Sequence, residues 1–88
     1  MIEKTVIVTG AGKGIGKAIA NAFAQKGYAV VVAEIDEANG QKTADEINSM
    51  GLNAIFIKTD VSLVDNIEKM VAHTVEKFGR IDVLVNNA

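Results

Sequence analysis

Cysteine is absent from this chain of 88 residues, which excludes a disulfide framework and any zinc site built on thiolates. No apolar stretch approaches the roughly 18 residues that a membrane-spanning helix needs. The first four residues lead straight into a strand pattern, so we expect no signal peptide. The net charge is −2 and the basic residues are scattered, unlike the basic patch of a nucleic-acid-binding protein. These absences favour a cytoplasmic protein with neither a membrane nor a nucleic-acid partner.

The apolar residues form four short runs, each typical of a strand buried in a parallel sheet. The runs span residues 5–9, 29–33, 54–57 and 81–85. Helical patterns lie between them, so the alternation predicts an α/β fold: a doubly wound parallel sheet of order 3-2-1-4 with three helices on its two faces. Apolar residues make up 49% of the chain, which is typical of a globular domain, and we expect residues 1–88 to form a single one.

Two of the three helical patterns carry an apolar face that is expected to pack on the sheet. In the first pattern this face consists of Ile15, Ala18, Ile19, Ala22 and Phe23. In the third it consists of Val64, Ile67, Val71, Thr74, Val75 and Phe78. Ser62 and Asp65 have the spacing of a capping box, which predicts that the third helix begins at Ser62.

A glycine-rich turn joins the first strand to the first helix. Such a turn directs backbone N–H groups and the positive end of the helix at one point, where a phosphate can bind. The G-x-G-x-x-G fingerprint fails because Ile15 stands at its third glycine, and the Walker form fails because of Ala11 and Ala18. The spacing that fits is T-G-x-x-x-G-x-G, at Thr9, Gly10, Gly14 and Gly16.

Residues 9–16 resemble the opening motif of the short-chain dehydrogenase/reductase family. The resemblance continues at Asp60 and Val61, and again at residues 86–88, which are similar to the family's Asn-Asn-Ala-Gly motif cut one residue short. It implies the first half of a Rossmann-type fold and a dinucleotide cofactor. By the same resemblance, the loop residues that bind this cofactor are Gly10, Lys13, Gly14, Ile15 and Gly16.

An acidic residue that ends the second strand can accept hydrogen bonds from the ribose hydroxyls. Glu34 and Asp36 are both in range, and the resemblance favours Glu34, which leaves Asp36 as the N-cap of the second helix. A carboxylate here repels a 2′-phosphate and implies NAD. Lys13, however, resembles the basic residue that pairs with this phosphate in NADP-preferring members. We therefore expect NAD as the cofactor, with NADP as the alternative.

The resemblance gives cofactor roles to four further residues. It places the Asp60 side chain against the adenine amino group, with the Val61 backbone beside it, although Asp60 could also serve only at the entry of the third helix. Asn87 resembles the family asparagine that borders the cofactor ribose and braces the sheet. Ala88 follows it in the same motif.

The family's chemistry is carried by a serine, a tyrosine and a lysine four residues after the tyrosine. The single tyrosine here is Tyr28, and Val32 stands four residues later, so no catalytic residue is assigned. His73, the single histidine, is interpreted as a surface residue, and no metal site is expected. The resemblance thus implies the cofactor-binding half of an enzyme that transfers hydride between NAD(P) and an alcohol or carbonyl substrate, with this chain inactive alone.

Two other functions compete with this one. The fourth strand would form an open apolar edge, which favours self-association and supports a non-catalytic, nucleotide-binding or self-associating fragment. Homo-oligomers are expected in either case. A methyltransferase that binds S-adenosylmethionine would also use the G-x-G-x-G at residues 10–14, but it usually has an acidic residue at the end of the first strand, where Thr9 stands.

Overall fold

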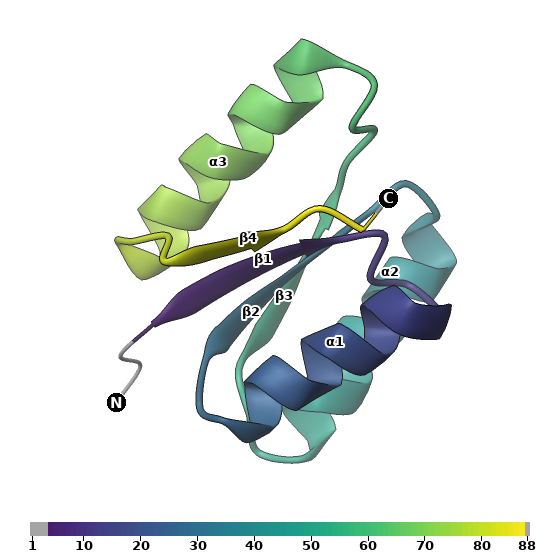
Figure 1. Ribbon diagram of the computed structural model, residues 1–88, viewed down its shortest axis with the longest axis vertical. Helices are drawn as coiled ribbons and strands as arrows, with labels where there is room; N and C mark the ends of the chain where they lie inside the picture. The colour runs from purple at the N-terminus through teal and green to yellow at the C-terminus, as the bar shows by residue number, and fades with distance from the viewer. Residues whose placement is uncertain (1–3, 88) are drawn as a thin grey trace.

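A computed structural model describes residues 4–87, which form one four-stranded parallel sheet with three helices packed against it (Figure 1). The elements in chain order are β1 (Thr5–Thr9), α1 (Gly14–Gln25), β2 (Ala29–Glu34), α2 (Glu37–Ser49), β3 (Ala54–Lys58), α3 (Val64–Phe78) and β4 (Val83–Val85). The strand order is β3-β2-β1-β4, which confirms the predicted topology. Helices α1 and α2 lie on one side of the sheet and α3 lies on the other (Figure 1).

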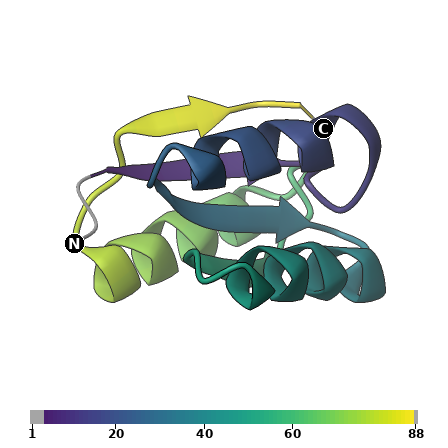
Figure 2. The ribbon, with the colours of Figure 1, turned by 90° about the horizontal axis from the view of Figure 1, so that it is seen from below.

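Strand β1 is central and pairs with β2 on one side and β4 on the other (Figure 2). All five of its residues are buried, as expected for a β-branched strand covered on both faces. Successive side chains alternate between the faces: Val6 and Val8 point to α1 and α2, whereas Ile7 points to α3. The parallel register places the carboxyl ends of all four strands at one edge of the sheet.

Helix α1 packs through only part of the predicted face. Its buried residues are Gly16, Ala20 and Ala24, whereas Ile15 is 74% exposed. The prediction holds for Ile19 and Phe23, which pack against the core, and was wrong for Ile15, Ala18 and Ala22, which are exposed. The helix begins so close to the end of β1 that small residues face the strands, and Phe23 packs only at the margin of the core.

Helix α3 uses only part of its predicted face. Thr74 is buried together with Met70, and Phe78 packs against the core, so these two members of the predicted face are confirmed. The rest of that face forms an apolar stripe that remains exposed, and its members are Val64, Ile67, Val71 and Val75. Periodicity alone therefore included a row of apolar residues that the sheet does not cover.

The amino-terminal ends of α2 and α3 test the two capping predictions. Asp36 caps α2 by accepting a hydrogen bond from the Asn39 amide, as predicted. The predicted capping box of α3 is wrong: the N-cap is Leu63, and the Ser62 hydroxyl donates instead to the Asp60 carboxylate at 2.6 Å. The Ser62 hydroxyl therefore bonds to Asp60 and does not cap α3.

Strand β4 begins two residues later than predicted, at Val83, because Asp82 ends the pairing with a side-chain contact. The Thr5 amide donates to Asp82 Oδ2 at 2.8 Å, while the Asp82 amide donates to the Thr5 carbonyl at 2.9 Å. Arg80 also donates two hydrogen bonds to the same carboxylate. This polar link joins the amino-terminal ends of β1 and β4.

Candidate functional site

The glycine loop between β1 and α1 has the geometry that a phosphate cradle requires. Gly10 and Gly14 have φ values of 63° and 62°, a conformation that side chains other than glycine rarely adopt. At Gly16 a Cβ atom would overlap the carbonyl oxygen of Gly10. All three glycines of the motif are therefore required by the backbone, which keeps this surface open to a ligand.

The amino terminus of α1 differs from those of the other helices. Its N-cap, Lys13, makes no side-chain capping hydrogen bond, and its first turn contains no acidic residue. Helix α2 is capped by Asp36 and begins with Glu37, and α3 carries Asp65 in its first turn. The positive end of α1 is thus not offset by an acidic side chain of its own, which suits an anionic group such as a pyrophosphate.

Glu34, the last residue of β2, lies against this loop. Its Oε1 atom accepts a hydrogen bond from the Gly12 amide at 2.8 Å, and its Oε2 atom accepts one from the Asp36 amide at 3.0 Å. A carboxylate has about four lone-pair positions, so both oxygens keep acceptor capacity for ribose hydroxyls. Of the two acidic candidates, Glu34 is the one beside the loop.

Lys13 and Ile15 are both exposed at the start of α1, with Lys13 immediately beyond the buried Gly12. Among residues 4–87, Lys13 makes no ion pair. The large apolar surface of Ile15 is presented to solvent at the site instead of to the core. Both side chains are therefore accessible to a bound molecule.

Asn87 closes the other side of the loop. Its side-chain amide donates to the Gly10 carbonyl at 3.3 Å, and its backbone amide donates to the Thr9 hydroxyl at 2.9 Å. The bracing of the sheet expected of this asparagine is thus visible, while its contact with a ribose stays a prediction. Ala88 lies outside the described residues.

Asp60 and Val61 follow β3 at the same edge of the sheet and line a cavity of about 90 Å³ beside the loop. The remaining lining residues are Gly10, Glu34, Ile35 and Thr59. Hydrogen bonds from the hydroxyl and the amide of Ser62 lower the pKa of Asp60, so its carboxylate is charged at neutral pH. An acceptor in a small pocket that is mostly apolar fits an amino-bearing aromatic ring such as adenine.

A larger cavity, of about 220 Å³, opens on the opposite side of the same edge, between α3 and β4. Its lining residues are Thr9, Val61, Ile67, Met70, Leu84 and Asn86. Val61 lines both cavities, so the segment that follows β3 borders both of them.

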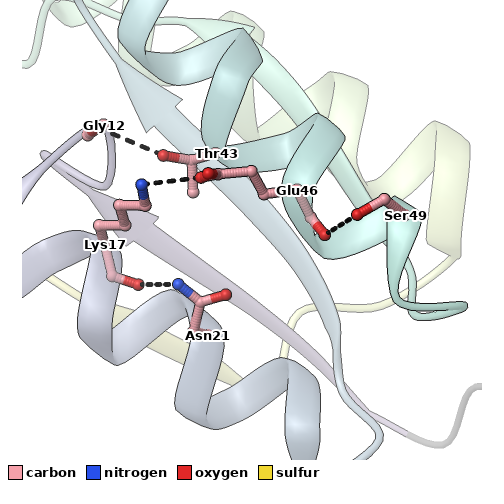
Figure 3. Close-up of polar contacts among 6 residues, drawn as sticks. All are labelled: Gly12, Lys17, Asn21, Thr43, Glu46 and Ser49. Carbon is pink, nitrogen blue, oxygen red and sulfur yellow. Dashed lines mark hydrogen bonds and ion pairs between the residues drawn. The ribbon is translucent and has the colours of Figure 1, made fainter.

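The sequence pattern missed two residues of this region, Gly12 and Thr43. Figure 3 shows the Thr43 hydroxyl, on α2, directed at the Gly12 carbonyl, to which it donates at 3.3 Å. Lys17 on α1 forms an ion pair of 2.7 Å with Glu46 on α2, which lowers the pKa of Glu46 (Figure 3). No local signal marks a threonine 31 positions from the loop, so only the fold could have found it.

Comparison with known proteins identifies the same family that the glycine-loop motif resembles. A family model described as short chain dehydrogenase matches residues 4–88. An uncharacterized oxidoreductase of Thermotoga maritima is 49% identical over 89 residues, which cover 100% of this chain and 35% of that protein. L-rhamnose 1-dehydrogenase (NAD(P)(+)) of Azotobacter vinelandii is 46% identical over 92 residues, or 100% of this chain and 36% of that protein.

The crystal structure of hydroxysteroid dehydrogenase from Escherichia coli has a TM-score of 0.96 and 38% identity, over 99% of this chain and 37% of that one. A parallel sheet of order 3-2-1-4 with this loop defines a Rossmann-type fold. The chain belongs to the short-chain dehydrogenase family. It spans about a third of the length of the curated relatives that it matches.

Two absences apply to the residues that the structure describes. Within residues 4–87, no group of three or more histidine, aspartate or glutamate side chains is placed to hold a metal ion. No helix in that range is both long enough and apolar enough to cross a bilayer.

Proposed function

We propose that this chain binds the adenosine and pyrophosphate parts of a nicotinamide dinucleotide at the carboxyl edge of its sheet. The observation that carries the proposal is the glycine loop, where Gly16 leaves room for no side chain against Gly10 and the first turn of α1 contains no acidic residue. Gly10, Gly14 and Gly16 would hold the pyrophosphate through the backbone. Asp60 and Val61 would contact the adenine ring, while Asn87 and Ala88 would border the ribose of the nicotinamide half.

We propose NAD over NADP as the cofactor. Glu34 supports this because its carboxylate is held at the loop and keeps acceptor positions for the ribose hydroxyls, whereas it would repel a 2′-phosphate. The exposed Lys13 is the opposing consideration, since its ammonium could pair with that phosphate. Family membership is compatible with either cofactor.

Isothermal titration calorimetry with NAD⁺, NADP⁺ and AMP tests this proposal directly. Tighter binding of NAD⁺ than of NADP⁺ is expected, and Glu34→Gln should reduce the preference by removing the charge but not the shape. Binding of NADP⁺ that exceeds that of NAD⁺ would assign the dominant role to Lys13. Absence of heat with all three ligands would leave a purely structural fragment as the better description.

For the whole protein, we propose hydride transfer between the nicotinamide and an alcohol or carbonyl substrate, in keeping with the family. The serine, tyrosine and lysine of the family's chemistry have no counterparts in these 88 residues, so the chain alone should not turn over substrate. A hydride-transfer assay of this chain checks that expectation. A cytoplasmic location also stays a prediction.

We further propose that the chain self-associates through the edge strand β4 and the adjoining face of α3. Leu84 on β4 is 59% exposed, and the apolar stripe of α3 lies on the same side of the sheet. Exposed apolar residues beside an unpaired strand edge favour association with a further copy. Light scattering of the chain should show dimers or larger species, and a sharp monomer peak would contradict this.

A further inference from the structure

Gly12, in the middle of the loop, is held on both sides of its Cα by side chains from two other elements. Its amide donates to Glu34 Oε1 at 2.8 Å, and its carbonyl accepts the hydroxyl of Thr43 at 3.3 Å. Glu34 ends β2 and Thr43 lies inside α2, so residues far from the loop in sequence hold the two peptide groups that flank Gly12.

Gly12 is a glycine for a reason that the loop motif does not explain. It occupies a variable position of T-G-x-x-x-G-x-G, and it has no positive φ value that would demand glycine. A Cβ atom there would lie 2.7 Å from Glu34 Oε1 and 2.8 Å from Glu34 Cγ. The glycine therefore makes room for the glutamate side chain, and the position of the carboxylate depends on the position of the Gly12 amide that it accepts from.

The direction of the Thr43 hydrogen bond is the second unusual feature. A threonine inside a helix commonly donates to the carbonyl four residues earlier, as Thr74 does to Met70 at 2.8 Å. The hydroxyl of Thr43 instead leaves its own helix and reaches the loop. Because Thr43 is 1% exposed, water does not readily replace this contact.

We infer that Thr43 is a positioning residue for cofactor discrimination, which it exerts through the Gly12 peptide and the Glu34 carboxylate. This inference rests on the proposed dinucleotide site. The hydroxyl holds the carbonyl of the Gly12–Lys13 peptide and so restricts the backbone rotation at Gly12. The preceding peptide, which carries the Gly12 N–H, then stays directed at Glu34 and keeps the carboxylate where ribose hydroxyls would meet it. Without the hydroxyl, the Gly12 carbonyl is left unpaired in a buried position, and turning its peptide toward another donor changes the backbone dihedrals of Gly12.

The test compares Thr43→Val, which keeps the shape and removes the hydroxyl, with Thr43→Ser, which keeps the hydroxyl. Thr74→Val is the matched control, because it removes an equally buried threonine hydroxyl that has no contact with the loop. Calorimetry gives the Kd for NAD⁺ and NADP⁺, and amide exchange measured by NMR follows the Gly12 N–H. Thermal unfolding reports the general cost of each change.

For Thr43→Val we expect the Kd for NAD⁺ to rise about five- to tenfold, the scale of one lost hydrogen bond, while the Kd for NADP⁺ changes less. Exchange of the Gly12 amide should accelerate. Thr43→Ser should stay within about twofold of the original protein in the two Kd values and in the exchange rate of the Gly12 amide. Thr74→Val should lower the unfolding temperature and leave both the affinities and the Gly12 amide unchanged.

A double-mutant cycle with Glu34→Ala separates positioning from a general effect on the loop. If Thr43 acts through Glu34, Thr43→Val adds no further change in the ratio of the two affinities once the carboxylate is gone. Equal weakening of NAD⁺ and NADP⁺ by Thr43→Val, or an unchanged Gly12 amide, would overturn the inference. If the original protein binds neither dinucleotide, it is the proposed function that fails, and the role in discrimination fails with it.

Discussion

The two faces of the sheet are covered to different extents. On the side of α1 and α2, the buried cluster draws on three strands and both helices, and it includes Val6, Val30, Ala24 and Ile47. On the side of α3, the buried cluster consists of Ile7, Val31, Ala33 and Met70. The first face is completed by the chain itself, whereas the second leaves an apolar stripe on its helix and Leu84 on its edge strand in contact with solvent.

Polar contacts between elements follow the same division. Thr43 joins α2 to the loop, and the ion pair of Lys17 and Glu46 joins α1 to α2. The buried hydroxyl of Thr74 on α3, by contrast, bonds only within its own helix. Helix α2 is thus fixed in register against the loop and α1, while α3 meets the sheet through the apolar side chains of Met70 and Phe78. We therefore expect substitutions on the α3 face to cost less unfolding free energy than substitutions on the face of α1 and α2.

The largest effect is expected from shortening a core side chain on the well-covered face. Ile47 on α2 is 0% exposed, so Ile47→Ala should cost about 2–5 kcal/mol of unfolding free energy through lost burial and a cavity. The matched change Ile67→Ala on α3, where 36% of the residue is exposed, should cost clearly less. Urea unfolding followed by circular dichroism measures both, and equal costs would break the comparison.

The next largest effect on stability is expected at Gly16, where α1 approaches the Gly10 carbonyl most closely. Gly16→Ala puts a methyl group onto the Gly10 carbonyl, and forcing the backbone apart should cost about 1–3 kcal/mol and weaken NAD⁺ binding at least tenfold. Gly51→Ala is the control: its φ of 78° strains an alanine, but nothing lies within 4 Å of the added atom. It should lower stability, as judged by thermal unfolding, without changing the Kd. Unchanged binding in Gly16→Ala would contradict the cradle.

Acid should act on the link between β1 and β4. Hydrogen bonds from Arg80, and then from the Thr5 amide, lower the pKa of Asp82 in the folded protein. A lowered folded pKa gives stability that is complete above the unfolded value of about 3.9 and is lost as the pH falls through the folded value. Asp82→Asn should therefore be less stable near neutral pH and lose less stability on acidification.

Unfolding by urea at a series of pH values measures this dependence for the original protein and for Asp82→Asn. Glu68→Gln, which removes an exposed carboxylate on α3, is the control and should follow the original curve closely. If Asp82→Asn shows the same loss of stability in acid as the original protein, the link between β1 and β4 does not contribute to the acid sensitivity.

The smallest effect is expected on the apolar stripe of α3. Val71 is 40% exposed, and Val71→Lys should change the unfolding free energy by no more than about 0.5 kcal/mol. The same change should reduce self-association in light scattering, because it places a charge on the proposed interface. A destabilisation like that of Ile47→Ala would instead show that this stripe is covered in solution.

The sequence was sufficient for the topology because the relevant signals are local. Short β-branched runs that alternate with helical patterns define a parallel sheet, and the spacing of Gly10, Gly14 and Gly16 identified the loop before any contact was known. Asp36 was also correctly assigned as a cap, since an N-cap depends on the next three residues alone.

A local pattern could not decide which apolar residues of each helix meet the sheet, nor could it find the Thr43 contact. Periodicity finds a row of apolar residues, but the close approach at Gly16 decided that Ala20 and Ala24 would meet the sheet. The capping box failed because Ser62 had a nearer acceptor in Asp60. Thr43 meets Gly12 only after β2 and α2 have folded, so this contact exists in the tertiary structure alone.

The place of β1 at the centre of the sheet has a consequence during protein synthesis. Strand β1 is made first, but its second neighbour, β4, begins only at Val83, which pairs with Val6, 77 residues earlier. At about 5–20 residues per second, the ribosome needs about 2–10 s to add the segment between β2 and β4. Through that interval one edge of β1 is available to any other extended chain. Arrival of β4 ends the exposure, so a ribosome that pauses within α3 would prolong the period in which the central strand can pair wrongly.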